Sequence, residues 1–433
     1  LKYYFSDKFK LDFGASGIYY DFDPGQVRPT TATSPVNPLS LDRKKALETG
    51  LYVNAEHKLT DNLTAQYGLR YSAFSRLGGQ AMVDYANDQP VVYNSVLGIY
   101  QRGTEIGETD YTKGDAIKGC GNFEPRVSLA YTLNDVSSVK LGFSRAAQYI
   151  HLLSSSGIGL PTDLWVSSTD RVKPQTSEQF AIGLAKDFFD KDYSITVEGY
   201  YKTMDDVIAY KEGASFLAIE DLEDGKTTNW EDNITSGQGW AHGGEILLRK
   251  QTGKLTGWLG YTLSWSERKF DELNLGKKFF DRYDRRHDIS LVGIYKPHDR
   301  ITLSATWVLS SGNNYTLPNL QRLNTPNGFP IQTSGNFFGS GETEDFATQR
   351  NNFRGETSHR LDLGIQLHKK LKKGRERTWG FSLYNSYARQ NPFIYTVGDS
   401  FYDYSDPNAT TEQELTRTSV LMLIPSFNYT FKF

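Results

Sequence analysis

The stretch Leu63-Thr64-Ala65-Gln66-Tyr67-Gly68-Leu69-Arg70-Tyr71-Ser72-Ala73 alternates between two kinds of side chain. Its odd positions carry leucine, alanine and tyrosine, whereas its even positions carry threonine, glutamine, glycine, arginine and serine. Because successive side chains of a β-strand point to opposite faces, this stretch predicts a strand with one apolar and one polar face. Gln66 and Arg70 belong to the polar face.

The same alternation recurs along the chain. A soluble β-sandwich would also alternate, so the class of fold depends on the connections between strands and on the end of the chain. Further examples occupy residues 51–59, 127–133, 255–265, 301–309 and 361–367.

The composition favours a barrel in a membrane. The chain has 433 residues, enough for one large barrel or for several soluble domains, and it is 14% aromatic but only 38% hydrophobic. Its mean hydropathy is -0.53, and no run approaches the roughly 18 apolar residues of a transmembrane helix. Transmembrane β-strands need only about 10 residues with one apolar face, and their barrels carry girdles of Tyr and Trp.

Charge and cysteine content exclude several classes of protein. The formal net charge is -3, and no basic tract interleaved with aromatics indicates a nucleic-acid partner. Cys120 is the only cysteine, so no disulfide framework and no thiolate metal site is expected. The sequence starts at Leu1 within an apparent strand, without an initiator Met or a signal peptide, and we therefore expect a fragment of a longer protein.

Short and long connections take turns along the sequence. Outer-membrane barrels have short periplasmic turns and longer extracellular loops, whereas Greek-key sandwiches do not sort their loops in this way. The expected short turns lie at 6–8, 60–62, 134–138, 187–192, 251–254, 296–300 and 370–377, and the long ones at 22–46, 76–122, 150–175, 211–238, 267–285, 311–357 and 398–414.

These patterns predict an all-β transmembrane antiparallel up-and-down β-barrel with about 15 visible strands. After a short strand at Leu1–Phe5, we expect strands at 9–21, 47–59, 63–75, 123–133, 139–149, 176–187, 193–209, 239–250, 255–266, 286–295, 301–310, 358–369, 378–397 and 415–433.

The last strand ends in alternating aromatics. Phe427, Tyr429, Phe431 and Phe433 share one face, and this arrangement resembles the assembly signal of bacterial outer-membrane proteins. We expect a bulge at Pro425, because proline removes one hydrogen bond of the ladder.

Several segments resemble the C-terminal part of the barrel of TonB-dependent outer-membrane receptors. The strand-turn-strand stretch 52–64 is followed by Gly68-Leu69-Arg70-Tyr71, similar to that family's "GLRY". Residues 171–179 resemble the start of a later barrel strand, 283–288 the family's "yDqrH" motif, and 426–433 its closing strand.

This resemblance implies the last part of a barrel of about 22 strands with a plugged lumen. Residues 1–433 would form one transmembrane barrel domain, without the N-terminal plug and the first strands. The implied function is active import of a scarce ligand across the bacterial outer membrane, where the ligand is an iron-siderophore, haem, cobalamin, glycan or peptide. The implied partners are a TonB-type energy-coupling protein acting through the plug, the barrel-assembly machinery, and lipid and lipopolysaccharide, with a surface lipoprotein as a further candidate.

Two other functions stay open at this stage. One is a passive outer-membrane channel of the porin or fatty-acid-transporter type. The other is a structural or adhesive barrel whose loops bind a partner in a surface complex.

Aromatic side chains in or beside the long loops are the candidate ligand contacts, because aromatic rings offer large faces with polar tips. No catalytic group, cofactor or metal site is readable: the histidines lack metal-ligand spacing, and His287 in the cluster 284–288 is expected to belong to a salt-bridge network at the barrel rim. The candidate ligand contacts are Tyr149, Trp165, Tyr210, Trp230 and Tyr315.

Two further segments of the chain are strongly charged. Acidic residues of the loop 211–238 indicate a solvated loop, with cation binding as the alternative. The basic turn 369–377 either contacts periplasmic-leaflet phosphates or keeps the turn soluble and unpaired.

Overall fold

The computed structural model describes residues 1–433 apart from stretches of the long connections. The residues left out are 24–25, 29–30, 32–38, 41–42, 80, 89–90, 95–98, 155–162, 170–171, 212–233, 318–319, 324–331, 334–335, 338–342 and 400–412.

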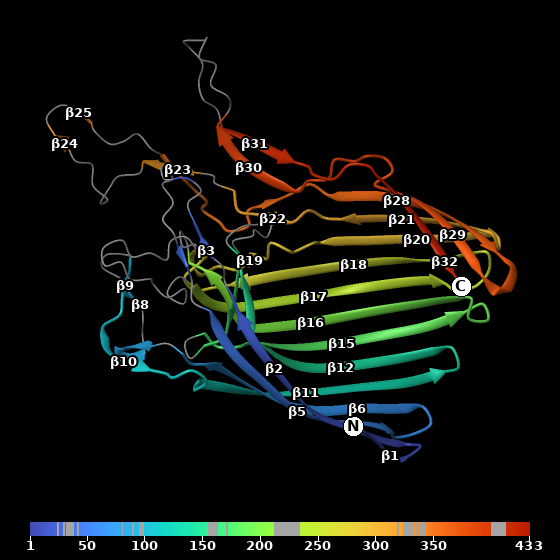
Figure 1. Ribbon diagram of the computed structural model, residues 1–433, viewed down its shortest axis with the longest axis horizontal. Coiled ribbons are helices and arrows are strands. Elements are labelled where there is room, and N and C mark those ends of the chain that lie inside the picture. Colours follow the sequence, from blue (N-terminus) through green and yellow to red (C-terminus); the bar gives the residue numbers. More distant parts are fainter. Residues whose placement is uncertain are drawn as a thin grey trace, which may run out of the picture. The chain divides into compact units, whose positions relative to one another are not determined.

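The main feature is a 16-stranded antiparallel sheet in which all strands except β19 follow one another in chain order (Figure 1). This order confirms the predicted up-and-down arrangement. The strands are β1 (Lys2–Ser6), β2 (Phe9–Phe22), β5 (Lys44–Lys58), β6 (Leu63–Leu77), β11 (Ala116–Asn134), β12 (Ser137–Gln148), β15 (Gln175–Phe188), β16 (Tyr193–Tyr210), β17 (Ile234–Lys250), β18 (Leu255–Lys269), β20 (His287–His298), β21 (Ile301–Ser310), β28 (Ser358–Lys370), β29 (Glu376–Tyr384) and β32 (Ile424–Lys432), with β19 (Phe279–Phe280) beside β18.

Short turns and long connections alternate along this sheet as predicted. The last two predicted strands, 378–397 and 415–433, are longer than the strands of the structure. The backbone leaves the sheet after β29 at Asn385, which has a φ of 51° and a fully buried side chain. The Asn385 amide donates to the carbonyl oxygens of Arg389 and Met422, so a turn replaces the strand expected over 378–397. The strand expected over 415–433 is likewise divided into β31 (Gln413–Thr418) and β32.

Small two-stranded sheets lie in the long connections. All of them except β30 and β31 fall within segments expected to be loops, because strands of two to six residues are too short to show a clear alternation. These pairs are β3 (Gln26–Val27) with β4 (Leu39–Ser40), β7 (Ala81–Tyr85) with β10 (Glu105–Asp110), β8 (Val91–Asn94) with β9 (Ile99–Arg102), β13 (Ile150–Leu153) with β14 (Leu164–Ser167), β22 (Asn314–Tyr315) with β27 (Phe353–Arg354), β23 (Leu320–Leu323) with β26 (Thr343–Phe346), β24 (Gln332–Thr333) with β25 (Asn336–Phe337), and β30 (Ile394–Asp399) with β31. Short 3-10 helices occupy Ala86–Asp88, Asn274–Gly276 and Lys372–Gly374, and none of the helices described is long and apolar enough to span a membrane.

The chain divides into two compact units. The first unit comprises Leu1–Thr132, Lys140–Ala181 and Lys202–Gly239. In β6 of this unit, Tyr67, Leu69 and Tyr71 are 44%, 42% and 42% exposed, whereas Ser72 is fully buried. The predicted apolar face is therefore the outer one, as a lipid-facing wall requires.

The second unit comprises Leu133–Val139, Ile182–Tyr201 and Trp240–Phe433. Within it, β18, β20 and β21 lie side by side (Figure 1), and the pairing continues through β28 and β29 to β32. The expected bulge at Pro425 is wrong, because Pro425 pairs with Leu383 without a register shift. Pro425 is the second residue of β32, so it lies at the end of the ladder.

Candidate functional site

A polar network crosses the even-numbered face of β2, β5, β6 and β11 in the first unit. Arg70 lies between two carboxylates, with Nη2 3.3 Å from Glu48 Oε1 and Nε 3.6 Å from Glu124 Oε1. The Tyr20 hydroxyl donates to Glu48 Oε2 at 2.9 Å, and the Ser72 hydroxyl donates to Glu124 Oε1 at 2.6 Å. Glu124 is only 5% exposed, and a charge buried to this extent is stable only when it is paired and hydrogen-bonded.

Tyr149, the residue directly after β12, is hydrogen-bonded to this network. Its hydroxyl lies 2.7 Å from Ser72 Oγ and accepts a hydrogen bond from Asn122 Nδ2 at 3.1 Å. Its ring stacks on Phe74 with centroids 5.1 Å apart, and both rings belong to a buried cluster with Ala46. Because the ring is 3% exposed, Tyr149 fastens the start of the long connection to the wall.

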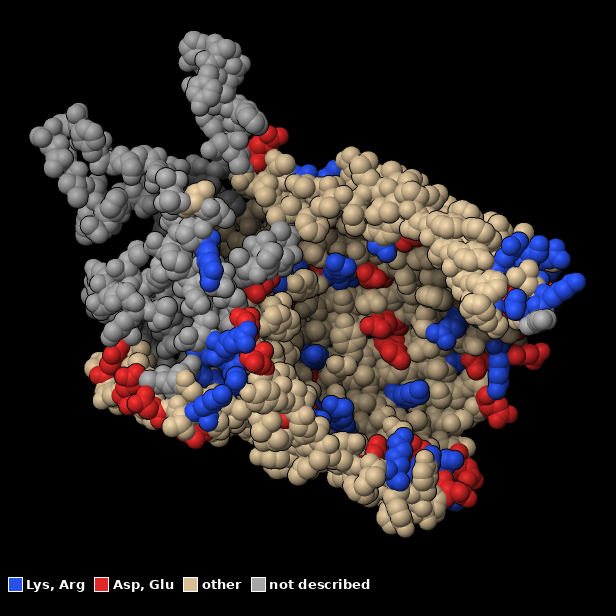
Figure 2. Space-filling view, in the orientation of Figure 1, with Lys and Arg blue, Asp and Glu red and all other residues tan. Residues whose placement is uncertain are grey.

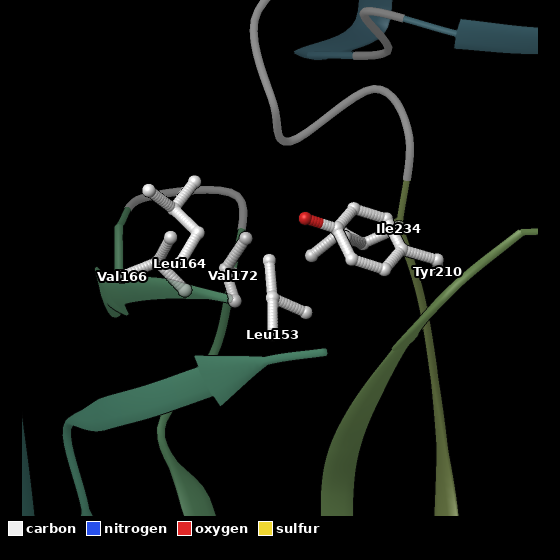
Figure 3. Close-up of a cluster of buried hydrophobic side chains, with 6 residues drawn as sticks. All are labelled: Leu153, Leu164, Val166, Val172, Tyr210 and Ile234. Carbon is white, nitrogen blue, oxygen red and sulfur yellow. The ribbon is translucent and has the colours of Figure 1, made fainter. Parts of the chain in front are cut away.

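A second buried cluster holds the β13–β14 hairpin against the ends of β16 and β17, all within the first unit. Figure 3 shows Leu153 and Val172 between Leu164 and Val166 on one side and Tyr210 and Ile234 on the other. Tyr210 is 4% exposed, so its ring packs against the hairpin and offers little surface to a ligand. The cluster consists of Leu153, Leu164, Val166, Val172, Tyr210 and Ile234.

Trp165 lies on the opposite side of this hairpin. It is 57% exposed, and its register partner Leu152 is 44% exposed. Leu164 and Val166 point inward on either side of it, so the strand alternation itself directs the indole outward. The hairpin thus presents the side chains of Leu152 and Trp165 on one face, while its other face is packed in the buried cluster.

His151 is a buried member of the same hairpin. It is 3% exposed, and its Nε2 lies 3.0 Å from the Ser168 hydroxyl. Burial lowers the pKa of His151 to about 4, which keeps the imidazole neutral near pH 7. A neutral, hydrogen-bonded histidine is suited to holding the hairpin closed.

In the second unit, Asp284 is the centre of a buried ionic cluster. Its carboxylate accepts from the backbone N–H of Ser266 at 2.6 Å, from Arg286 Nη2 at 3.2 Å and from Arg354 Nη2. Arg286 also lies over the Trp265 ring, 4.5 Å from its centroid. Asp284 and Arg286 thus form part of the salt-bridge network expected for residues 284–288, whereas the side-chain contact described for His287 is not a salt bridge. His287 itself contacts the Tyr261 hydroxyl through Nδ1 at 3.0 Å.

The ionic cluster ties three segments of the second unit together. Arg354 Nη1 donates to the carbonyl oxygens of Asp284 and Gly312, and Asn314 Nδ2 donates to the carbonyl of Asp281 at 2.9 Å. Gly312 lies so close to the backbone of Gly355 that a Cβ there would overlap the Gly355 carbonyl. The connection after β18, the start of the connection after β21 and the segment before β28 therefore form one packed support.

Tyr315 lies in an aromatic group on this support. The Tyr395 ring packs edge-on against Tyr315 and Phe353, each with centroids 5.2 Å away. The Tyr395 hydroxyl accepts from the backbone N–H of Glu356 at 2.9 Å, and burial raises the pKa of Tyr315. Tyr315 as a residue is partly buried.

The structure thus separates the five candidate ligand contacts. Tyr149 and Tyr210 are buried in different clusters of the first unit, Trp165 is exposed, and Tyr315 is half-buried. Trp230 and most of the acidic loop 211–238 lie outside the described residues. Within the part of the chain that the structure describes, no group of three or more His, Cys, Asp or Glu residues could hold a metal ion.

Sequence reasoning missed the two carboxylates that pair with Arg70. Glu48 and Glu124 share the polar face of their strands, so the same parity that placed Arg70 on this face would have found them. Glu48 and Glu124 hold the Arg70 guanidinium in place. The packed hairpin and the ionic support each present aromatic rings that are already ordered, so a ligand would not need to order them on binding.

Comparison with known proteins agrees with this architecture. A family model described as "TonB dependent receptor-like, beta-barrel" matches residues 1–286, whereas no curated protein matches. The solved pyoverdine outer membrane receptor FpvA from Pseudomonas aeruginosa PAO1 is 14% identical, with a TM-score of 0.54 over 100% of this chain and 51% of that chain. The FrpB iron transporter from Neisseria meningitidis is 13% identical, with a TM-score of 0.52 over 99% of this chain and 54% of that one.

The ferric-catecholate import receptor Fiu from E. coli K12 is similar as well. Its closed form is 14% identical and has a TM-score of 0.50 over 98% of this chain and 52% of that chain. The chain therefore spans about half the length of the solved structures that it matches. The sheet order, the alternating faces and the family match lead to one conclusion: this chain belongs to the TonB-dependent receptor family of outer-membrane β-barrels.

Proposed function

We propose that this chain is the C-terminal wall of a receptor that imports a scarce ligand across the outer membrane with energy supplied through TonB. The observation that carries the proposal is the family match over residues 1–286, about half of which form the strands of the wall. A plug outside this chain would make the contact with the TonB-type protein. The barrel-assembly machinery, lipid, lipopolysaccharide and a surface lipoprotein are further partners within this proposal.

The long-connection rim is the proposed place of ligand binding. Trp165, which is 57% exposed on the packed hairpin of the first unit, is the proposed contact there. Tyr315, on the ionic support of the second unit, is a separate candidate. Tyr149 and Tyr210 have a supporting role in this proposal, because their rings fill the clusters beneath. The solved neighbours carry names that refer to iron, copper and pyoverdine, and an iron-siderophore is accordingly the first ligand to test, followed by haem, cobalamin, glycans and peptides.

The test is uptake by cells that produce the full-length receptor. Each radiolabelled ligand is offered to cells with and without a functional TonB, and the proposal expects uptake that requires both the receptor and TonB. Uptake that persists without TonB would instead establish a passive channel. Absence of uptake for every ligand class, together with loss of a surface complex when the receptor is deleted, would establish a structural or adhesive barrel.

The ligand contacts are tested by affinity on the same cells. Trp165→Ala should weaken binding about tenfold, since buried aromatic contacts commonly contribute 1 kcal/mol or more. Tyr67→Ala is the matched control, because Tyr67 is an exposed aromatic on the apolar face of the wall. Equal affinities of the Trp165→Ala and wild-type receptors would contradict the placement of the site, and would leave TonB-dependent uptake intact.

A further inference from the structure

Two basic side chains lie opposite each other on the apolar side of the β28–β29 hairpin. Lys369 and Arg377 are register partners, and the preceding pair on the same face is Leu367 with Trp379. Because side chains alternate along a strand, both cations point to the face that carries the exposed apolar residues. Like charges directly opposite each other destabilise a sheet, so an anion bound between Lys369 and Arg377 would stabilise this pair.

The hairpin does not supply that anion. Glu376 is the only acidic residue between 369 and 377, and its register partners are Lys370 and Lys432 on the other face. Arg377 Nε is buried and has no hydrogen-bond partner among the residues that the structure describes. Because protein atoms cover Nε, an anion on the outer surface would bind the other nitrogens of this guanidinium.

The neighbouring aromatics indicate the level of this pair in the membrane. The Trp379 ring packs on Tyr429 and Phe427 with centroids 4.7 and 5.5 Å away, and Trp379 and Tyr429 are 39% and 48% exposed. Trp and Tyr concentrate at the headgroup level of outer-membrane barrels. Lys369 and Arg377 lie one further pair along the strands, about 7 Å toward the short turn, where lipid phosphates begin.

Figure 2 shows Lys and Arg side chains gathered at the end of this hairpin, which is orange in Figure 1 (Figure 2). The β28–β29 turn is one of the short turns, which face the periplasm in this class of barrel. The leaflet on that side consists of phospholipids. The positive charge of the pair, its lipid-facing direction and its depth in the membrane therefore all favour the phosphate group of a phospholipid as the partner.

We propose that Lys369 and Arg377 bind the phosphate of an anionic phospholipid, of the phosphatidylglycerol class, in the periplasmic leaflet. The planar guanidinium of Arg377 provides paired donors that match two phosphate oxygens, and the Lys369 ammonium adds a mobile point charge. This site lies on the outer surface of the wall and does not depend on which ligand the receptor imports.

Native mass spectrometry of the full-length receptor tests the site. The detergent-solubilised receptor is mixed with equal amounts of phosphatidylglycerol and phosphatidylethanolamine that have the same acyl chains, and the ratio of bound lipids is measured. The wild type should retain phosphatidylglycerol preferentially. Lys369→Gln with Arg377→Gln should lower this preference at least fivefold, because one basic residue near an anionic surface contributes about that factor.

The matched control is Lys370→Gln with Lys432→Gln, which removes the same charge from the opposite face. This control should keep the wild-type preference. An equal loss in both variants, or no preference in the wild type, would overturn the proposal. Unchanged lipid binding with loss of a crosslinked periplasmic protein from the Lys369→Gln Arg377→Gln receptor would overturn it in favour of an acidic protein partner. Heat-modifiable gel mobility verifies assembly, and Lys369→Gln alone carries the test if the double variant does not assemble.

Discussion

Replacement of Asp284 by Asn should loosen the ionic support of the second unit while leaving the strands of the wall intact. The Asp284 side chain is fully buried and accepts hydrogen bonds from Arg286, Arg354 and the backbone of Ser266. Asn keeps the size of the side chain but removes the negative charge. Two guanidinium groups then face a neutral amide that can accept with one oxygen only.

The size of the effect follows from the exposure of the partners. Removing one partner of a fully buried ion pair costs about 3–5 kcal/mol. Arg286 and Arg354 are 21% and 31% exposed, so water recovers part of that loss and the retained amide oxygen recovers more. We expect about 2–3 kcal/mol of local destabilisation, or roughly 30- to 150-fold more frequent opening of the support.

Hydrogen–deuterium exchange of the full-length receptor measures this opening. Peptides covering 266–287 and 311–317 should exchange faster in Asp284→Asn by the stated factor, whereas peptides within β20 and β21 should not change. Asp271→Asn is the control, because Asp271 is 95% exposed and its ion pair with Lys269 is a surface contact of 3.8 Å. Exchange within threefold of wild type in Asp284→Asn, or an equal increase in the control, would refute the reasoning.

Three further predictions concern other parts of the chain. Burial lowers the pKa of His151 from 6.5 to about 4, so between these pH values the unfolded hairpin binds more protons than the folded one. The stability of the hairpin should therefore be complete above about pH 6.5 and fall progressively toward pH 4. Hydrogen exchange measured against pH should show this dependence in the wild type and not in His151→Gln. Gly312→Ala forces a methyl group against a backbone carbonyl and should cost about 1–3 kcal/mol of local stability by the same exchange method, whereas Gly293→Ala enters open space and should cost less than about 1 kcal/mol. Phe433→Ala should lower the yield of assembled barrel measured by heat-modifiable gel mobility, and a loss of equal size in Lys432→Ala would contradict an assembly signal carried by the aromatic face.

The strands of the wall could be predicted because the physical cause of their pattern is local. Side chains of a strand between lipid and a polar interior must alternate between apolar and polar. A few neighbouring side chains, such as Tyr67 and Arg70, therefore suffice to recognise such a strand. The order of the strands then follows from the alternation of short and long connections. The turn at Asn385 was missed because alternation continues on both sides of it, although Asn is a residue that favours turns.

The loop supports could not be predicted in the same way, because their contacts join residues far apart in sequence. Asp284 and Arg354 are separated by 70 residues, and nothing in either local sequence indicates the other. The ends of β16 and β17 likewise supply Tyr210 and Ile234 to a hairpin whose strands begin at Ile150 and Leu164.

The alternation rule nevertheless extends into the loops once a hairpin is known. In β14 the sequence Leu164-Trp165-Val166 reads inward, outward, inward, so the exposed indole and the buried aliphatic side chains have one common cause. Tyr210 has no such neighbourhood, since its burial depends on the hairpin that packs over it. Aromatic residues in long loops are therefore better ranked as ligand contacts by their parity within a local hairpin than by their type alone. By this criterion Trp165 ranks above Tyr149 and Tyr210 as the first residue to replace in a binding assay.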